Sequence, residues 1–344
     1  MLKPNHLRKS LLLVLSAAAL VILSGCVKST DTPPPPTDTP VVMPAETITA
    51  EPTASPAKLL LVDPAGQAGD ELRAYLSSFS IENGLTIETL TSPDLPAQGE
   101  ETKVVIFLTE PANLSDIVTA SPATHFIVVG DIENTAFPNL SVIRAAGEDL
   151  AFMGGFLAMQ IAWDWRSAAL IPTDTVMSAE KADAFENGAR FVCGQCTPYY
   201  SPIVYFPLLA QESTQAGYTS WDAQVTNLVQ HFVNTYYIDP AISTPELLDQ
   251  LKGLEDRIYN KVYLIGLAVV ADDRYTAILD FDILPALEQL LPQVLAGTGG
   301  QSVNALVKIV VNNNDQVVSI AKVDNFNRAA EDLAAGIIYP LSIP

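Results

Sequence analysis

Short hydrophobic runs recur along the chain from residue 58 onward, and amphipathic stretches separate many of them. Runs of this kind are typical of strands buried on both faces of a parallel sheet, and the stretches between them are typical of helices. The first group of expected strands lies at 58–63, 85–90, 103–108, 125–130 and 140–145. The second group lies at 166–173, 201–207, 235–240 and 262–270. The pattern therefore predicts two strand–helix series in tandem.

One expected helix, residues 148–163, is apolar nearly all round, which indicates a buried helix. Gly154 and Gly155 lower its helix propensity, so we expect them to permit close packing. The other helices are expected at 70–80, 179–191, 221–233, 244–254, 278–295 and 327–335. A Ser-Thr-Pro-Glu cap signal begins the helix at 244–254, and Pro285 should kink the one at 278–295.

Two such series predict an α/β protein with two Rossmann-like lobes, each built on a parallel sheet, and a ligand cleft between the lobes. We expect lobe one to comprise residues 58–165 plus 276–344, and lobe two to comprise residues 166–275. Near the end of the chain, residues 304–311 and 316–323 alternate around an Asn-rich turn. This alternation predicts a β-hairpin.

The start of the chain has the pattern of an export signal. Basic side chains and no acidic ones precede an apolar run at 11–23, which is shorter than the roughly 20 residues of a transmembrane helix. The Leu-Ser-Gly-Cys sequence that ends at Cys26 resembles the lipobox of bacterial lipoproteins. The resemblance implies that residues 1–25 are a signal peptide, removed before Cys26. Lipid on Cys26 would then hold the chain on the extracytoplasmic face of a cell membrane, its only contact with the membrane.

Residues 26–57 are expected to form a disordered tether between this anchor and the folded body. The segment 27–57 contains eight Pro and seven Thr residues and little that can build a core. Because Pro fixes φ and removes hydrogen-bond donors, such a segment stays extended.

The charge of the chain excludes some partners. Removal of the three basic residues before Cys26 leaves 15 basic and 39 acidic side chains, a net charge of −24. A body this acidic repels phosphate backbones, so nucleic acid is not an expected partner.

Residues with catalytic or metal-binding chemistry are few. The three His residues fit no zinc-ligand spacing, and no nucleotide-binding or nucleophile motif occurs, so we expect no enzyme activity, no metal and no cofactor. Cys193 and Cys196 form a CxxC pair. A structural disulfide suits an exported chain, and free thiols or a redox role are the alternatives. Asp280 and Asp282 fall where acids cap a helix start.

The middle of the chain has a strand at 126–130, a Pro-Asn pair and strand at 137–145, a helix at 148–162, a strand at 168–174, and Phe185 with Gly188 on the next helix. This order resembles the basic membrane protein family of type 1 periplasmic binding proteins. The resemblance implies a lipid-anchored solute-binding protein of an ABC importer, with a nucleoside-like small molecule and a transporter permease as partners.

Two departures from the family pattern concern the ligand. The family's Ser-Phe-Asn segment after its first strand has no counterpart here, and Ala268 stands where the family has Asp. A membrane-tethered sensor or adaptor, with the same fold and a changed or lost ligand, is therefore the alternative function.

Six polar side chains near the ends of expected strands are the candidate ligand-binding residues. They are Asp63, Gln67 and Asp70 in lobe one, Asp174 and Asp239 in lobe two, and Asp272 near the crossing back. Ligands in such folds lie beyond the carboxyl ends of the strands, where carboxylates accept hydrogen bonds from hydroxyls and amines. The alternative for each Asp is a solvated turn that ends a strand.

Overall fold

The computed structural model describes residues 56–132, 137–270, 272–312 and 316–341. The expected signal peptide, Cys26 and nearly all of the expected tether lie outside these residues. Within them, no helix is long and apolar enough to cross a membrane.

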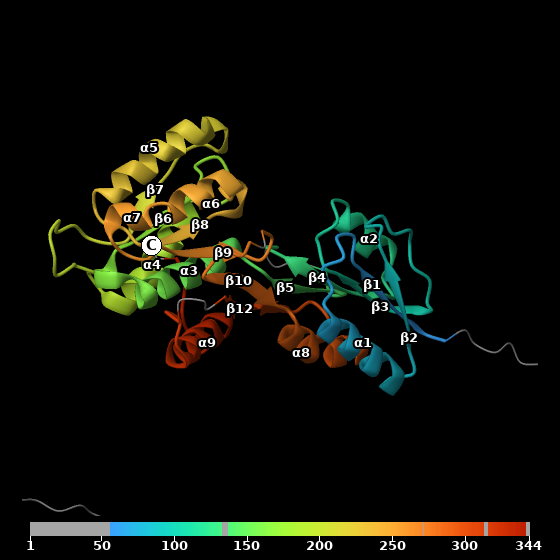
Figure 1. Ribbon diagram of the computed structural model, residues 1–344. Helices are drawn as coiled ribbons and strands as arrows, with labels where there is room; N and C mark the ends of the chain where they lie inside the picture. Colours follow the sequence, from blue (N-terminus) through green and yellow to red (C-terminus); the bar gives the residue numbers. More distant parts are fainter. Residues whose placement is uncertain (1–55, 133–136, 271, 313–315, 342–344) are drawn as a thin grey trace, which may run out of the picture. The chain divides into compact units, whose positions relative to one another are not determined.

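Two six-stranded sheets organise the described residues (Figure 1). The first sheet has the order β11-β5-β4-β3-β1-β2, and all its strands are parallel. Its strands are β1 (Lys58–Val62), β2 (Thr86–Leu90), β3 (Thr102–Phe107), β4 (His125–Gly130), β5 (Leu140–Arg144) and β11 (Ser302–Asn304).

The second sheet has the order β12-β10-β9-β8-β6-β7 and is parallel except for β12, which runs antiparallel to β10. Its strands are β6 (Ser167–Leu170), β7 (Leu208–Ala210), β8 (Thr235–Ile238), β9 (Tyr263–Leu267), β10 (Ala277–Asp282) and β12 (Leu306–Val311). The expected α/β fold with two mostly parallel sheets is confirmed.

Helices cover both faces of the first sheet because its inner strands place apolar side chains on both faces. Leu59 and Leu61 pack under α1 (Asp70–Glu82) and α8 (Leu284–Leu295). Leu60 and Val62 face the other way, toward α2 (Leu114–Ala120). This alternation explains why β1 reads as an unbroken hydrophobic run.

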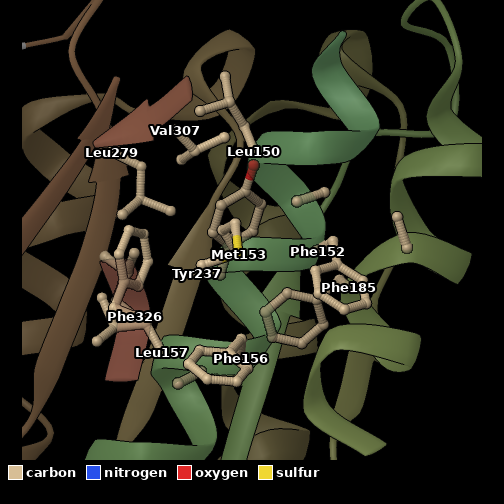
Figure 2. Packing of buried hydrophobic residues seen from close by; sticks show 14 of the residues in the cluster. Leu150, Phe152, Met153, Phe156, Leu157, Phe185, Tyr237, Leu279, Val307 and Phe326 are labelled. Atoms are coloured by element: carbon tan, nitrogen blue, oxygen red, sulfur yellow. The ribbon is translucent and has the colours of Figure 1, made fainter. Parts of the chain in front are cut away.

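The second sheet is covered in the same way. One face packs against α3 (Gly147–Ile161), α4 (Ser178–Cys193) and α9 (Ile320–Ala334). The other face packs against α5 (Gly217–Val229), α6 (Pro245–Lys252) and α7 (Glu255–Ile258). Figure 2 shows the first of these cores, with Phe152, Phe156 and Leu157 of α3 among side chains from α4, α9 and the sheet.

Close contact between α3 and α4 depends on glycine. A Cβ atom at Gly155 would overlap the carbonyl of Phe185, and one at Gly188 would overlap the carbonyl of Phe152. A Cβ atom at Gly154 would overlap the ring of Tyr237. The expectation that Gly154 and Gly155 permit close packing is confirmed.

The chain passes between the two sheets three times, after β5, after β10 and after β11. The expected division placed residues 276–344 in lobe one, but β10, β12 and α9 belong with the second sheet. Only α8 and β11 of residues 276–344 belong with the first sheet. The helix α3, which the expected division also placed in lobe one, packs on the second sheet. A strand belongs to the sheet that holds its hydrogen-bond partners, and hydrophobic pattern alone does not identify those partners.

Three local expectations were wrong. The helix expected at 278–295 is strand β10 followed by α8, and Pro285 lies in the first turn of α8, where its missing N–H costs nothing. The strand expected at 201–207 is irregular, because Pro202 and Pro207 cannot donate to a ladder. The hairpin is absent from the described residues, since β12 pairs with β10 and α9 begins at Ile320.

Candidate functional site

A pocket of about 750 Å³ lies beside the carboxyl edge of the first sheet, where β10 leads into α8. Its apolar lining includes Leu108, Val129 and Ala145 from the ends of β3, β4 and β5, and Ala268 and Val269 from the loop after β9. The pocket therefore receives residues that follow strands of both sheets. Its polar lining consists of Gln67, Asp70, Glu71, Asp280, Asp282 and Lys308.

Two of the pocket's carboxylates have partners at the crossing from β10 to α8. Asp280 accepts a hydrogen bond from the N–H of Phe281 and pairs with Lys308 across the β10–β12 ladder, Nζ to Oδ2 3.4 Å. Asp282 accepts a 3.1 Å hydrogen bond from the N–H of Leu284 at the start of α8. Both carboxylates belong to β10, and the residue that precedes α8 is Ile283, so the expected capping role was wrong for Asp280; Asp282, at the end of the strand, bonds one N–H of the first turn of α8 without occupying the capping position.

Asp63 organises the loop that brings Gln67 to the pocket. Its carboxylate is almost fully buried and accepts hydrogen bonds from the N–H groups of Gln67, at 2.6 Å, and Ala68, at 3.1 Å. The same carboxylate pairs with Arg73 of α1 at 3.1 Å. Asp70, in the first turn of α1, is exposed and lines the pocket. The loop after β1, held by Asp63, thus contributes Gln67 to the pocket, and the start of α1 contributes Asp70.

A cluster of charged side chains lies at the start of α3, at the same edge of the first sheet; we call it the α3 cluster. Its centre is Arg144, the last residue of β5, which pairs with Asp131 at 3.4 Å, with Glu148, and with Asp149 at 3.8 Å. Burial raises the pKa of Asp149 to about 7; Arg144 opposes the rise, and Glu148 and Asp131 add to it. Glu148 is 2% exposed, and its Oε2 atom has no hydrogen-bond partner.

Asp239 is connected to the start of α3 by Lys181 of α4, which pairs with Asp239 and lies against Gly147. Lys181 Nζ lies 3.3 Å from Asp239 Oδ2, and its stem lies so close to Gly147 that a Cβ there would be 3.0 Å from Cε. Asp239, the residue after β8, also accepts a 3.0 Å hydrogen bond from the N–H of Ala241 in the turn that follows. Nearby Tyr237 is buried without a partner for its hydroxyl, and burial raises its pKa far above the ordinary value. We include Lys181 and Asp239 in the α3 cluster.

Asp174 and Asp272 lie in other surroundings. Asp174 is bonded to Ser213 at 2.6 Å and to the N–H of Thr214 at 2.8 Å, and these bonds lower its pKa to about 2. Asp272 pairs with Arg274 at 2.6 Å, which lowers the pKa of Asp272 to about 2. Each carboxylate orders its own loop. The structure therefore places Gln67 and Asp70 in the pocket lining with the buried Asp63 behind them, and does not join Asp174 or Asp272 to them.

The sequence analysis missed Arg144, Glu148, Asp149, Lys181 and Asp131. One signal was available, because charged residues stand directly after a buried strand and at the start of an otherwise apolar helix. The pairing with Lys181 had no such signal, since it depends on the packing of α3 on α4.

The CxxC pair and the tyrosines near it lie elsewhere in the second lobe. Cys193 and Cys196 are joined in a disulfide, with 5.0 Å between their Cα atoms. The loop that follows carries Tyr200, whose ring stacks on Trp163 with 5.6 Å between ring centroids. Trp163 precedes β6, so this pair lies by the amino end of a strand, away from the carboxyl ends where ligands sit in such folds.

The described ranges contain no set of three or more His, Cys, Asp or Glu side chains arranged to hold a metal ion. The pocket and the α3 cluster can donate and accept hydrogen bonds and interact with charge.

Comparison with known proteins identifies the fold through solved structures and not through sequence. No model of a protein family matches the sequence, and no curated protein matches it. An ABC transporter solute-binding protein from Conexibacter woesei is 16% identical, with 84% of this chain and 98% of that chain covered and a TM-score of 0.50. At this identity the likeness shows the fold, which is that of type 1 periplasmic binding proteins.

Two further structures have TM-scores of 0.49. An ABC transporter solute-binding protein from Aeropyrum pernix is 11% identical over 83% of this chain and 93% of its own. A transcriptional activator of the comK gene from Bacillus halodurans is 11% identical over 83% of this chain and 100% of its own.

Proposed function

We propose that this chain is the lipid-anchored, extracytoplasmic solute-binding protein of an ABC importer, and that it binds a nucleoside-like small molecule. The observation that carries the proposal is the pocket beside the carboxyl ends of β3, β4 and β5, which also receives residues that follow β9. Open α/β sheets bind ligands beyond the carboxyl ends of their strands. The pocket volume of about 750 Å³ lies within the roughly 300–1,000 Å³ range of small-molecule sites.

The chemistry of the pocket supports a polar solute. Its lining combines an apolar wall with polar groups that include Gln67, Asp70, Glu71 and Lys308. Hydroxyl and amine groups of a solute would donate to these carboxylates and to the amide oxygen, and a flat apolar ring would contact the wall. Such a mixture of apolar surface and a few polar groups is typical of small-molecule sites.

The proposed cellular role joins this site to the export signal. A receptor held by lipid on Cys26 would present its solute to a membrane permease, and the Conexibacter woesei protein is described as part of an ABC transporter system. The tether at 26–57 would let the body reach the permease while the lipid stays in the bilayer.

A membrane-tethered sensor or adaptor is the second candidate function. Ala268 lines the pocket at the position where the resembled family has Asp, so one expected ligand carboxylate is replaced by a methyl group. The loop after β1 also lacks the family's Ser-Phe-Asn segment. These two changes favour a changed or lost solute.

Titration calorimetry with a panel of nucleosides, combined with small-angle scattering, tests the proposal. The wild-type chain should bind at least one nucleoside and become more compact, because a ligand drives closure through contacts that exist only in the closed state. Asp63→Ala should weaken binding by releasing the loop that carries Gln67, whereas Asp183→Asn, a change at an exposed carboxylate of α4, should not. If no nucleoside binds and the scattering never changes, the sensor or adaptor replaces the importer.

A further inference from the structure

The α3 cluster holds more negative than positive charge. Four carboxylates pair with two basic groups: Asp131, Glu148 and Asp149 pair with Arg144, and Asp239 pairs with Lys181. Three of the carboxylates depend on the one guanidinium of Arg144. With every carboxyl group ionised, the cluster has two negative charges without counterions among the described residues.

One carboxylate oxygen at the centre of this cluster lacks a partner. Glu148 is 2% exposed; its Oε1 accepts from Arg144, and its Oε2 is buried with no hydrogen bond from any described residue. A buried acceptor without a donor is costly, and more so when it is charged. A donor of a bound molecule would remove this cost only if the Glu148 side chain turns toward the exposed side of the cluster, because Oε2 itself is shielded from solvent.

The basic groups of the cluster and of the pocket are already paired. Arg144 contacts three carboxylates, Lys181 contacts Asp239, and Lys308 contacts Asp280. An anionic solute would therefore have to break one of these ion pairs. It would also approach Asp70 and Glu71, which line the pocket.

The cluster is open to solvent on one side. The side chains of Arg144 and Asp131 are 32% and 34% exposed, and that of Lys181 is 20% exposed. The cluster and the pocket share one edge of the first sheet, where the N–H of Ala145 bonds to the carbonyl of Gly130 at 3.1 Å. Ala145 itself lines the pocket and directly follows Arg144. Because successive side chains of a strand point to opposite faces, Arg144 and Ala145 lie on opposite faces of β5, and a solute that contacts both must cross the carboxyl ends of β4 and β5.

We infer that the solute carries a positive charge, as an ammonium or amidinium group, and that the α3 cluster recognises this charge through the carboxylates of Glu148 and Asp131. The inference rests on the proposed solute-binding function and names the charge class of its ligand. Charge-assisted hydrogen bonds are roughly twice as strong as neutral ones, so a charged solute gains most where carboxylates outnumber cations.

Proton release provides a second signature of the same event. Burial raises the pKa of Asp149 to about 7, and the charged groups around it are Arg144 of β5, Glu148 of α3 and Asp131 after β4. The ion pair of Lys181, on α4, with Asp239, which follows β8, lies beside the start of α3. A positive charge bound in the α3 cluster would lower the pKa of Asp149. Binding near pH 7 should therefore release a fraction of a proton from Asp149.

The test uses two matched ligand series and the mature lipoprotein in detergent. One series is 5′-amino-5′-deoxyadenosine, adenosine and adenosine 5′-monophosphate, and the other is glucosamine, glucose and glucose 6-phosphate. Within at least one series the amine should bind about tenfold or more tightly than the neutral compound, and the phosphate should bind weakest. Calorimetry in two buffers of different ionisation enthalpy should show proton release on binding of the amine.

Two variants distinguish recognition by the α3 cluster from a general effect of surface charge. Glu148→Gln should reduce the preference for the amine over the neutral compound, and Asp183→Asn should leave that preference unchanged. Thermal unfolding of each variant shows whether it is folded. If the neutral compound or the phosphate binds as tightly as the amine, the charge inference is wrong and the solute-binding function stands. If no compound of either series binds, the inference and the proposed function both fail.

Discussion

Replacing Asp149 by Asn should stabilise the protein at neutral pH and leave its stability in acid nearly unchanged. Asp149 is 4% exposed, and burial raises its pKa from 3.8 to about 7. Because the folded pKa lies above the unfolded one, the folded chain holds the proton more tightly. The stability associated with this proton is therefore complete below pH 3.8 and is lost as the pH rises to about 7.

The size of the stability change follows from the difference between the unfolded and folded pKa values of Asp149. One pKa unit corresponds to about 1.4 kcal/mol, so the rise from 3.8 to about 7 costs about 4 kcal/mol of unfolding free energy once Asp149 is ionised. Asn has nearly the same shape and no charge, so the variant avoids this cost. The stability gained by Asp149→Asn should grow by about 1.4 kcal/mol per pH unit from about pH 5 to pH 7 and then level off.

Urea unfolding followed by circular dichroism, at several pH values between about 5 and 8, measures this difference. Asp183→Asn is the matched control, because Asp183 is an exposed carboxylate on α4. Its stability relative to wild type should not change with pH. A constant offset between Asp149→Asn and wild type across the whole range would refute the electrostatic account of the α3 cluster.

Three further predictions concern the anchor, the disulfide and the helix packing. Cys26→Ser should release the protein from the membrane fraction or leave its precursor uncut; processing and fractionation like wild type would contradict the lipid anchor. Intact mass after alkylation should show Cys193 and Cys196 modified only after reduction, and two modified thiols in unreduced protein would count against the bond. Gly188→Ala should lower the unfolding free energy by about 1–3 kcal/mol or more, because the added methyl group would overlap the Phe152 carbonyl. Unchanged stability in denaturant would show that α3 and α4 can move apart to accept the methyl group without cost.

Several parts of the fold could be predicted from sequence because their signals are local. The run at 58–62 is apolar at every position after Lys58, so it suits a strand that helices cover on both faces. Thr244 accepts a hydrogen bond from the N–H of Leu247 at 3.3 Å, as its cap signal indicated. Paired glycines in a long apolar helix indicated close packing before any partner helix was known.

Other parts could not be predicted because they depend on contacts between distant segments. Strand β10 has an apolar pattern that also fits a helix, and its pairing with β9 and β12 decides the matter. The candidate site shows the same limit. Asp63 was expected at the site, but its bonds to its own loop and to Arg73 make it a support for Gln67. The α3 cluster depends on how β4, β5, α3 and α4 meet.

Native mass spectrometry of the mature lipoprotein, purified from the cells that make it, tests the central claim most directly. The account predicts a fraction of the protein with a bound small molecule, consistent with a pocket of about 750 Å³, that denaturation releases. The released molecule should carry an amine or another positively charged group, and adding it back to ligand-free protein should restore the complex. A single ligand-free mass, from protein that also binds no member of the nucleoside or sugar series, would contradict the claim that this chain is a solute receptor.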